Sequence, residues 1–531
     1  MHDDHAAGVE KRHGGVEVPQ RALIGVVTID LHQVVAFPGA LDLREAVRNV
    51  VVGGLVVDRQ AVIDRACMTI DDAPPHRVDR GLRHVPQNTL TVVDRGASVC
   101  VKAMKALSGR KSTMRAKMLG GLALAASLLA STAVAFAEDV TVRMLYIGDT
   151  KAYNEILQGI ADTYMKANPG VKIVLMPMEN EALKAKLPTM LQSDDAPDIF
   201  TSWGGGVMLA HEQAGYLADL TTEKDNLSKV IVPAAIGAFQ VDGKQVGLAD
   251  SLSLVSVYVN KPLLAKANVS IDDLKTWDGF KGAVTKLRAA GITPVLTGGK
   301  DEWPLQFYLG YLLLREGGGS VVADLKANGF NQPVFLKAAQ ELVDFGKLNP
   351  FQDGWLSKTW PDSAGQFGDS GGAMYLMGNW IISQQAQDAK DGKGISAADL
   401  GIVPFPTGVP GGKGTSETLG GIAGYEVNAK APSEAAKFLE FYASREQQKP
   451  IAQAGLNIPS AIDADQDLKD PQLREIAKQI AASPMHQNFL DQDLGPDVGR
   501  VMNDVATALV AGSMTPEDAA KALQEAWDNS K

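Results

Sequence analysis

The stretch "GKQVGLADSLSLVSVYVNKPLL" (residues 243–264) decides the fold, because it is a long run of β-forming residues interrupted by small polar ones. Valine, leucine and tyrosine dominate it, as is typical of strands. The polar residues Asp250, Ser251 and Ser253 fall near its middle. An extended segment of this length often crosses between two lobes of a protein.

The chain before this segment alternates between strand and helix patterns. We predict strands over 139–147, 171–178 and 198–203, and helices over 152–170 and 181–197. A β-α-β-α-β order predicts an α/β fold with parallel strands and helices on both faces of the sheet. Ligands bind at the loops where the strands of such a sheet end.

Helical patterns dominate the rest of the chain. We predict helices over 276–290, 303–316, 333–347 and 432–444, and a mostly helical tail over 464–531. The sequence contains no internal repeat or heptad array.

A secretory signal peptide is predicted over residues 114–137. The stretch "MRAKMLGGLALAASLLASTAVAFAEDV" (residues 114–140) has two basic residues near its start, continues with an apolar run over 119–130 and contains the cleavage pattern Ala135-Phe136-Ala137. An uncleaved membrane anchor is the competing interpretation, but the run is rich in alanine and ends in a cleavage pattern.

Residues 1–113 differ in composition from everything that follows. They hold six of the eight histidines, both cysteines and a single aromatic residue, Phe37. A folded stretch of this length with one aromatic has a poor core. We therefore expect residues 1–113 to be an upstream segment that is included because the start codon is assigned too far upstream. A separate small domain is the alternative.

The predicted mature chain, residues 138–531, is acidic. Of the 51 basic and 62 acidic residues, 17 basic and 13 acidic ones precede residue 138, which leaves 34 against 49 and a net charge of −15. Such a chain is poorly suited to bind nucleic acid or an anionic membrane. It contains no cysteine, which excludes thiol catalysis, cysteine-ligated zinc and iron–sulfur chemistry from this part.

Five stretches in this part resemble a known family. They are "PDIFTSWGGG", "VYVNKPLLAKA" before "TWDGF", "GITPVLTGGKDEWP", "GGAMYLMGNW" and "APSEAAKFLEFYASREQQKPIAQAGLNIPS". In this order, behind a signal peptide, they resemble the family 1 extracellular solute-binding proteins of ABC transporters, the group that includes maltose-binding protein. The resemblance covers nearly all of residues 138–531.

The resemblance implies a type II periplasmic-binding-protein fold, in which two discontinuous lobes are joined by a hinge. Lobe one would comprise 138–250 and 410–455, and lobe two 251–405 and 460–531. It also implies that a monomeric periplasmic protein captures a sugar, a di- or oligosaccharide, between its lobes. The protein would deliver that sugar to the inner-membrane subunits of an ABC permease, with no cofactor and no catalysis.

Sugar sites need aromatic planes for the apolar ring faces, and this sequence offers several candidate tryptophans. Trp203 follows a predicted strand, and Trp380 follows the Gly378-Asn379 turn, where the resembling family has a stacking platform. Trp303 lies at the start of a helix that it could equally pack against, and Trp355 lies in a candidate cleft-rim loop together with Trp360.

Sugar sites also need carboxylates and hydroxyls for the ring hydroxyls. Asp149 lies in the first strand–helix loop and is either a ligand contact or a helix N-cap. Asp250 and Ser253 lie on the crossing strand, where a carboxylate is either a ligand contact or a buried hinge group. Asp301 is the fourth polar candidate.

The remaining candidates are backbone contacts. Gly204 and Gly205 follow Trp203 and would let a ligand approach the main chain closely. Thr418, Gly420 and Gly421 lie in "ETLGG", where the resembling family returns to lobe one and touches ligand.

Two other functions stay open at this stage. A polyamine would also suit aromatic residues surrounded by carboxylates. An exported polysaccharide hydrolase would need a pair of catalytic carboxylates, which the sequence does not single out. His211 and His486 are the only histidines after residue 137, and they lack the spacing of metal ligands, so no metal site is predicted.

Overall fold

The computed structural model describes residues 26–30, 89–94, 99–100, 139–414 and 416–531. The chain forms two compact units, residues 1–133 and 134–531. In the first unit, β1 (Val26–Asp30), β2 (Thr89–Asp94) and β3 (Val99–Cys100) form an antiparallel sheet. The predicted signal peptide and most of the predicted upstream segment lie outside the described residues.

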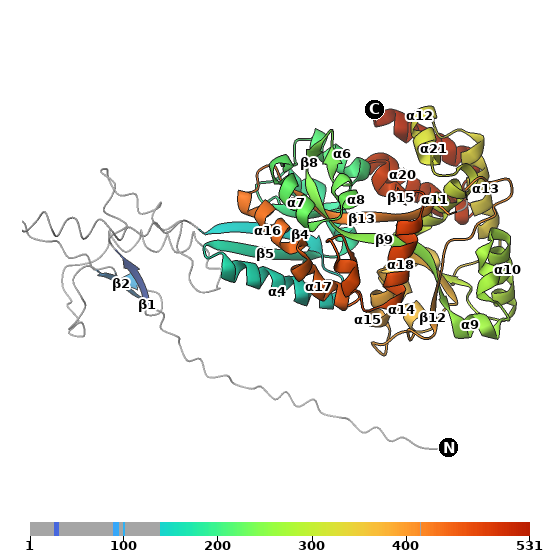
Figure 1. Cartoon of the computed structure of the whole chain (residues 1–531), viewed down its shortest axis with the longest axis horizontal. Coiled ribbons are helices and arrows are strands. Elements are labelled where there is room, and N and C mark those ends of the chain that lie inside the picture. Colours follow the sequence, from blue (N-terminus) through green and yellow to red (C-terminus); the bar gives the residue numbers. More distant parts are fainter. Residues whose placement is uncertain (1–25, 31–88, 95–98, 101–138, 415) are drawn as a thin grey trace, which may run out of the picture. The chain divides into compact units, whose positions relative to one another are not determined.

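Strand β9 (Gly247–Asn260) runs through the middle of the second unit and links its two halves (Figure 1). Its first part pairs with β13 (Thr418–Val427). Its last part pairs with β11 (Met374–Gly378) on one edge and β12 (Leu400–Val403) on the other. The crossing strand expected from the sequence is therefore present, and it is part of a ten-stranded sheet.

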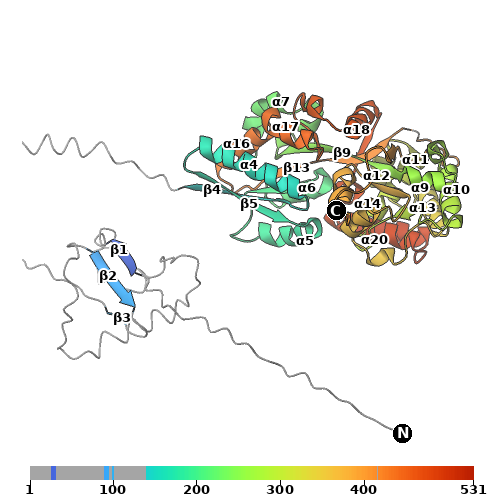
Figure 2. The same ribbon diagram turned by 90° about the horizontal axis from the view of Figure 1, so that it is seen from below.

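The first half of the unit begins with the predicted strand–helix alternation. Strands β4 (Val140–Ile147), β5 (Val171–Met178) and β6 (Ile199–Ser202) are parallel, with β4 in the centre. Helices α4 (Lys151–Ala167) and α5 (Asn180–Leu191) cover opposite faces of β4 and β5 (Figure 2). The carboxyl ends of these strands therefore meet at one edge, beside β9.

Two hydrophobic cores divide the unit. The first surrounds β4 and β6 and includes Ala249 of β9, and the second begins at Leu254 of the same strand. Between them lie Asp250, Ser251 and Ser253, which are small or polar and belong to neither core. This division gives the two-lobed α/β fold class that the sequence predicted.

Helix α10 (Trp277–Ala289) illustrates how the sequence builds the second half. Thr276 caps it, since the threonine Oγ1 accepts a hydrogen bond from the N–H of Gly279 at 3.2 Å. Trp277 is fully buried, and its ring stacks on that of Phe280. Its Nε1 donates a hydrogen bond to Glu341 at 2.7 Å. Trp277 is thus a structural residue.

The second unit contains further elements of both kinds. The remaining strands are β7 (Gln240–Val241), β8 (Lys244–Gln245), β10 (Val295–Leu296), β14 (Ile458–Pro459) and β15 (His486–Asn488). The remaining α-helices are α6 (Gly205–Gln213), α7 (Lys224–Val230), α8 (Pro233–Gly237), α9 (Lys261–Lys266), α11 (Trp303–Gly317), α12 (Val321–Asn328), α13 (Pro333–Gly346), α14 (Trp360–Gly368), α15 (Ile381–Asp388), α16 (Ser433–Ala443), α17 (Arg445–Gln453), α18 (Pro471–Ala482), α19 (Leu490–Asp493), α20 (Pro496–Val510) and α21 (Pro516–Asn529). The 3-10 helices are η3 (Thr221–Glu223), η4 (Ile271–Lys275), η5 (Trp355–Ser357) and η6 (Ala464–Asp467). Within the described ranges, no helix has the length and apolar character needed to cross a bilayer.

Candidate functional site

A cavity of about 220 Å³ lies between the two halves, beside the middle of β9. The first half contributes the loop after β4, the start of α5 and the end of β6. The second half contributes the starts of α11, α14 and α15, and the segment around α19. The lining residues are Ile147, Asp149, Thr150, Tyr153, Asn180, Lys184, Thr201, Trp203, Asp250, Ser251, Leu252, Ser253, Trp303, Phe307, Trp360, Asn379, Trp380, Ser383, Gln384, Ala423, Gly424, Tyr425, Leu456, Asn457, Phe489, Asp491 and Gln492.

Aromatic rings form one wall of the cavity. The ring centroid of Trp303 lies 6.0 Å from that of Trp360, 6.3 Å from that of Trp380 and 5.5 Å from that of Phe307. Phe489 also belongs to the group, and its ring centroid lies 6.0 Å from that of Trp380. Trp203 lines the cavity from the first half. These rings offer flat apolar faces, which suit the C–H faces of sugar rings.

The orientation of Trp380 depends on the glycine two residues before it. Gly378 ends β11, and a Cβ on it would lie 2.0 Å from Cζ3 of the Trp380 ring. Because glycine has no side chain, the indole folds back over the strand end and faces the cavity. Asn379, between them, accepts a hydrogen bond from the N–H of Leu254 at 2.9 Å and anchors the turn to β9.

Asp149 presents a carboxylate to the cavity. Its Oδ2 is buried and has no hydrogen-bond partner among the described residues. Burial raises the pKa of Asp149 to about 6, and the nearby charge of Glu179 adds to the shift. The N-cap of α4 is Thr150, so the N-cap role considered for Asp149 is not the one it has. A buried acceptor without a partner in a cavity is suited to receive a ligand hydroxyl.

Asp250 lies at the floor of the cavity and ends a chain of tyrosine hydroxyls. Tyr442 donates to Asp250 Oδ1 at 2.5 Å, and the Tyr153 hydroxyl lies 2.7 Å from that of Tyr442 and 2.8 Å from that of Tyr425. Burial raises the pKa of Asp250 to about 6. Asp250 is therefore a buried group between the two cores that also lines the cavity, and its contact with a ligand stays a prediction.

Two other predicted residues lie behind the cavity wall. Oδ2 of Asp301 accepts from the N–H of Trp360 at 2.6 Å, so Asp301 fixes the start of α14. Burial raises the pKa of Asp301 to about 6. Trp355 packs against Phe351, with 5.0 Å between the two ring centroids, and its ring also lies against Gly299. Neither Asp301 nor Trp355 is among the lining residues.

The glycines after Trp203 meet another part of the protein. A Cβ on Gly205 would lie 2.9 Å from the carbonyl oxygen of Gln492, and the carbonyl of Trp203 accepts from Asn488 Nδ2 at 3.0 Å. Gly204 has a φ of 66°, which favours glycine. These glycines allow close approach, as predicted from their type, but the backbone that approaches is that of α19.

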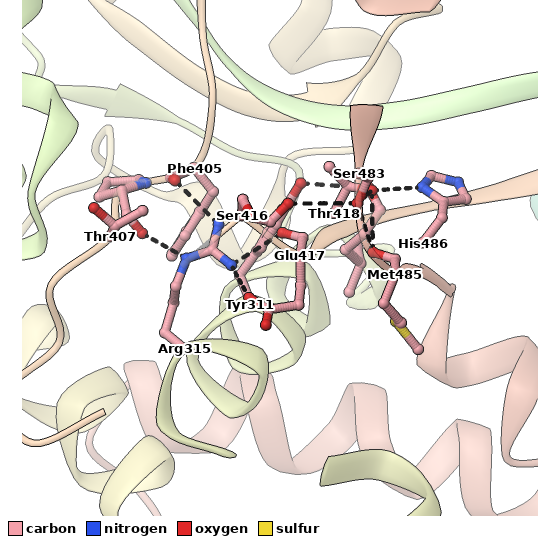
Figure 3. A network of polar contacts seen from close by, with 12 residues as sticks. Tyr311, Arg315, Phe405, Thr407, Ser416, Glu417, Thr418, Ser483, Met485 and His486 are labelled. Atoms are coloured by element: carbon pink, nitrogen blue, oxygen red, sulfur yellow. Dashed lines mark hydrogen bonds and ion pairs between the residues drawn. The ribbon is translucent and has the colours of Figure 1, made fainter. Parts of the chain in front are cut away.

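Thr418 lies away from the cavity, in a polar network (Figure 3). Its Oγ1 donates to Ser483 Oγ at 2.9 Å and lies 2.8 Å from His486 Nδ1. Burial lowers the pKa of His486 to about 4, so this histidine is a neutral structural group.

Gly420 and Gly421 also lie outside the lining but support it. A Cβ on Gly420 would lie 2.0 Å from the carbonyl oxygen of Ser253, and one on Gly421 would lie 2.4 Å from the Phe489 ring. Ser253 Oγ donates to the Gly421 carbonyl at 3.1 Å. The two glycines therefore let β9 and Phe489 come close enough to complete the cavity.

Several lining residues gave no signal in the sequence. Phe489, Asp491 and Gln492 lie in the tail that the sequence marks only as helical, and Lys184 has the spacing of an ordinary helix surface residue. Among the residues that the structure describes, no three histidine, cysteine, aspartate or glutamate side chains gather as a metal site would require.

Residues 148–449, more than half of the chain, match the family model of bacterial extracellular solute-binding proteins. The chain belongs to this family. The resemblance found in the sequence is thereby confirmed, and the described fold agrees with it.

This solute-binding protein is similar to two curated relatives. It is 26% identical over 376 residues to an uncharacterized ABC transporter extracellular-binding protein of Pyrococcus horikoshii, covering 67% of this chain and 81% of the other. It is 24% identical over 442 residues to a probable sugar-binding periplasmic protein of Mesorhizobium japonicum, covering 79% of this chain and 100% of the other.

The fold also matches solved structures. One from work on xylan utilization by the thermophilic bacterium Caldanaerobius polysaccharolyticus has a TM-score of 0.68 and 27% identity. The match covers 73% of this chain and 99% of that one.

Proposed function

We propose that this solute-binding protein captures a sugar of one or more rings in the cavity beside β9 and delivers it to an ABC permease. The observation that carries the proposal is the cavity itself. Four tryptophans face it, Trp203, Trp303, Trp360 and Trp380, together with the unpartnered acceptor of Asp149. A sugar has both apolar ring faces and hydroxyl donors, and this cavity offers a match for each.

The site residues follow from this geometry. The tryptophans would stack on the sugar, while Asp149, Asp250 and Ser253 would accept from its hydroxyls. The indole Nε1 of Trp303 is a buried donor without a partner among the described residues, and it would donate to a sugar oxygen. The sugar-binding annotation of the Mesorhizobium relative and the xylan context of the solved structure support this ligand class.

Delivery requires two lobes that close over the sugar. We propose lobe one as 138–250 with 410–455 and lobe two as 251–405 with 460–531, hinged where β9 crosses between the cores. A ligand that touches both lobes stabilises the closed state, which a permease can then recognise. The family and the Pyrococcus relative support the transporter partner.

We propose that the protein acts as a monomer in the periplasm after cleavage of residues 114–137, and that it releases its sugar chemically unchanged. The extracellular description of the family supports export. The alternative of an exported hydrolase predicts that a labelled oligosaccharide is cleaved during incubation.

A thermal-shift titration tests the proposal. Residues 138–531 are titrated with glucose, galactose, xylobiose, raffinose and chitobiose. We expect at least one sugar to stabilise the fold, by about 2.7 kcal/mol at a concentration one hundred times its Kd. Trp303→Ala should abolish the shift, whereas Trp527→Ala, on the terminal helix α21, should keep it. No response to any sugar in this panel, with cleavage of a labelled oligosaccharide, would favour the enzyme instead.

A further inference from the structure

Lys184 is the one basic side chain among the described residues that line the cavity. It extends from α5, and its Nζ lies 5.3 Å from the ring centroid of Trp203 and 5.6 Å from that of Trp303. Glu181 Oε1, one turn earlier, lies 3.3 Å from the same nitrogen. Trp203 follows strand β6 of the first half and packs against the second core, to which Trp303 itself belongs. The ammonium group therefore contacts rings from both halves.

The rest of the cavity is attractive to a cation. The other charged lining groups are the carboxylates of Asp149, Asp250 and Asp491. Aromatic faces attract cations through their quadrupole, and carboxylates attract them through their charge. Without Lys184, the cavity would combine both features and would suit a polyamine. With Lys184 in place, the protein's own ammonium occupies the position between the tryptophans.

We propose that Lys184 determines the specificity of this cavity by occupying its cation position, so that it rejects positively charged solutes and admits neutral sugars. The proposal rests on the proposed sugar-binding function and extends it. A ligand ammonium that enters beside Lys184 is repelled by its like charge. This repulsion is screened less inside the partly buried cavity than it would be in bulk water.

A neutral sugar meets no such penalty. The ammonium of Lys184 is a donor, and sugar hydroxyls accept hydrogen bonds from it. A site can select one ligand by placing a repulsive group against its competitor, and Lys184 is placed to do this.

Substitution of Lys184 by methionine tests the proposal, because methionine keeps most of the length of the side chain and removes its charge. Wild type and Lys184→Met are titrated with spermidine and with the neutral sugar that binds wild type, following tryptophan fluorescence. We expect the spermidine affinity of Lys184→Met to exceed that of wild type at least tenfold, with a smaller change in sugar affinity. Lys186→Met, an exposed position on the same helix, should leave both affinities unchanged.

A charge-preserving variant separates charge from shape. Lys184→Arg keeps the cation and should reject spermidine as wild type does. If Lys184→Met fails to fold, Lys184→Gln makes the same comparison. Variants that bind the sugar but bind spermidine no more tightly than wild type would overturn the role of Lys184 and leave the sugar function intact. Tight binding of spermidine by wild type, with no sugar bound, would overturn both.

Discussion

Asp250 shows how one residue joins the hinge to the binding cavity. It lies on β9 between the two cores, and its carboxylate receives the hydroxyl of Tyr442. Because that hydroxyl proton points to Asp250, Tyr153 must donate to Tyr442, and Tyr425 to Tyr153. One carboxylate therefore orders three tyrosines that come from α4, β13 and α16.

The raised pKa of Asp250 predicts a pH-dependent stability. The native carboxyl has a pKa of about 6 against an ordinary 3.8, so its contribution to folding is present below pH 3.8 and lost as pH rises through 6. A shift of this size corresponds to about 3 kcal/mol. Asp250→Asn does not titrate, so its unfolding free energy relative to wild type should rise by up to this amount between pH 4 and pH 7.

Urea denaturation of both proteins without sugar, at several pH values, measures this difference. Groups that titrate in the same way in both proteins cancel in the difference between the two unfolding free energies. Parallel pH curves for wild type and Asp250→Asn would show that burial of this carboxylate does not govern the stability.

Short connections between elements place the side chains of the cavity. Strand β11, which is fully buried, and helix α15 are joined by Asn379 and Trp380. The three-residue strand β15 pairs with β13 and leads into α19, which brings Phe489 and Asp491 to the cavity. A strand of three residues is too short to show the alternating pattern of a strand in the sequence. For this reason the sequence indicates only a helical tail there.

The turn between β11 and α15 predicts the effect of Gly378→Ala. The new Cβ would overlap the Trp380 ring, so the indole must leave its position over the strand. We expect sugar affinity to fall at least tenfold and stability to fall by about 1–3 kcal/mol, as for other overpacked sites.

Calorimetric titration and thermal melting check this expectation. Gly282→Ala is the control, because its Cβ would meet nothing within 4 Å and the residue lies inside helix α10. There, alanine should raise stability by about 1 kcal/mol and leave affinity unchanged. Unchanged sugar affinity in Gly378→Ala would mean that Trp380 does not stack on the ligand.

At the scale of the whole molecule, direct contacts across the cavity hold the two halves together. Gln387 of α15 accepts from the N–H of Lys151 at 3.0 Å and donates to the carbonyl of Asp149 at 2.9 Å. Gln384, one turn earlier, accepts from Thr150 Oγ1 at 3.3 Å. These contacts join the loop before α4 to the second half, so they favour the closed arrangement.

The Gln387 contacts predict that Gln387→Ala shifts the ligand-free protein toward a more open state. Two lost hydrogen bonds correspond to about 1–3 kcal/mol, so the sugar Kd should rise roughly five- to a hundredfold. Small-angle scattering should show a larger radius of gyration without sugar and the wild-type value at saturation.

Gln340→Ala is the matched control, since this exposed glutamine donates to Asp344 on its own helix α13. It should change neither the radius nor the Kd. An unchanged radius in Gln387→Ala would show that these contacts do not set the closed population.

The alternating strands and helices, the long crossing strand and the export signal could be predicted from the sequence by itself. They depend on local periodicity and composition. The sequence also singled out Trp203, Trp303, Trp355 and Trp380 as candidate ligand contacts, from their places in the sequence and from the family resemblance. Only the tertiary structure decided that Trp360 lines the cavity while Trp355 packs behind it. Lys184, Trp303 and Phe489 are far apart in sequence, and folding alone brings them to one cavity, which no local pattern records.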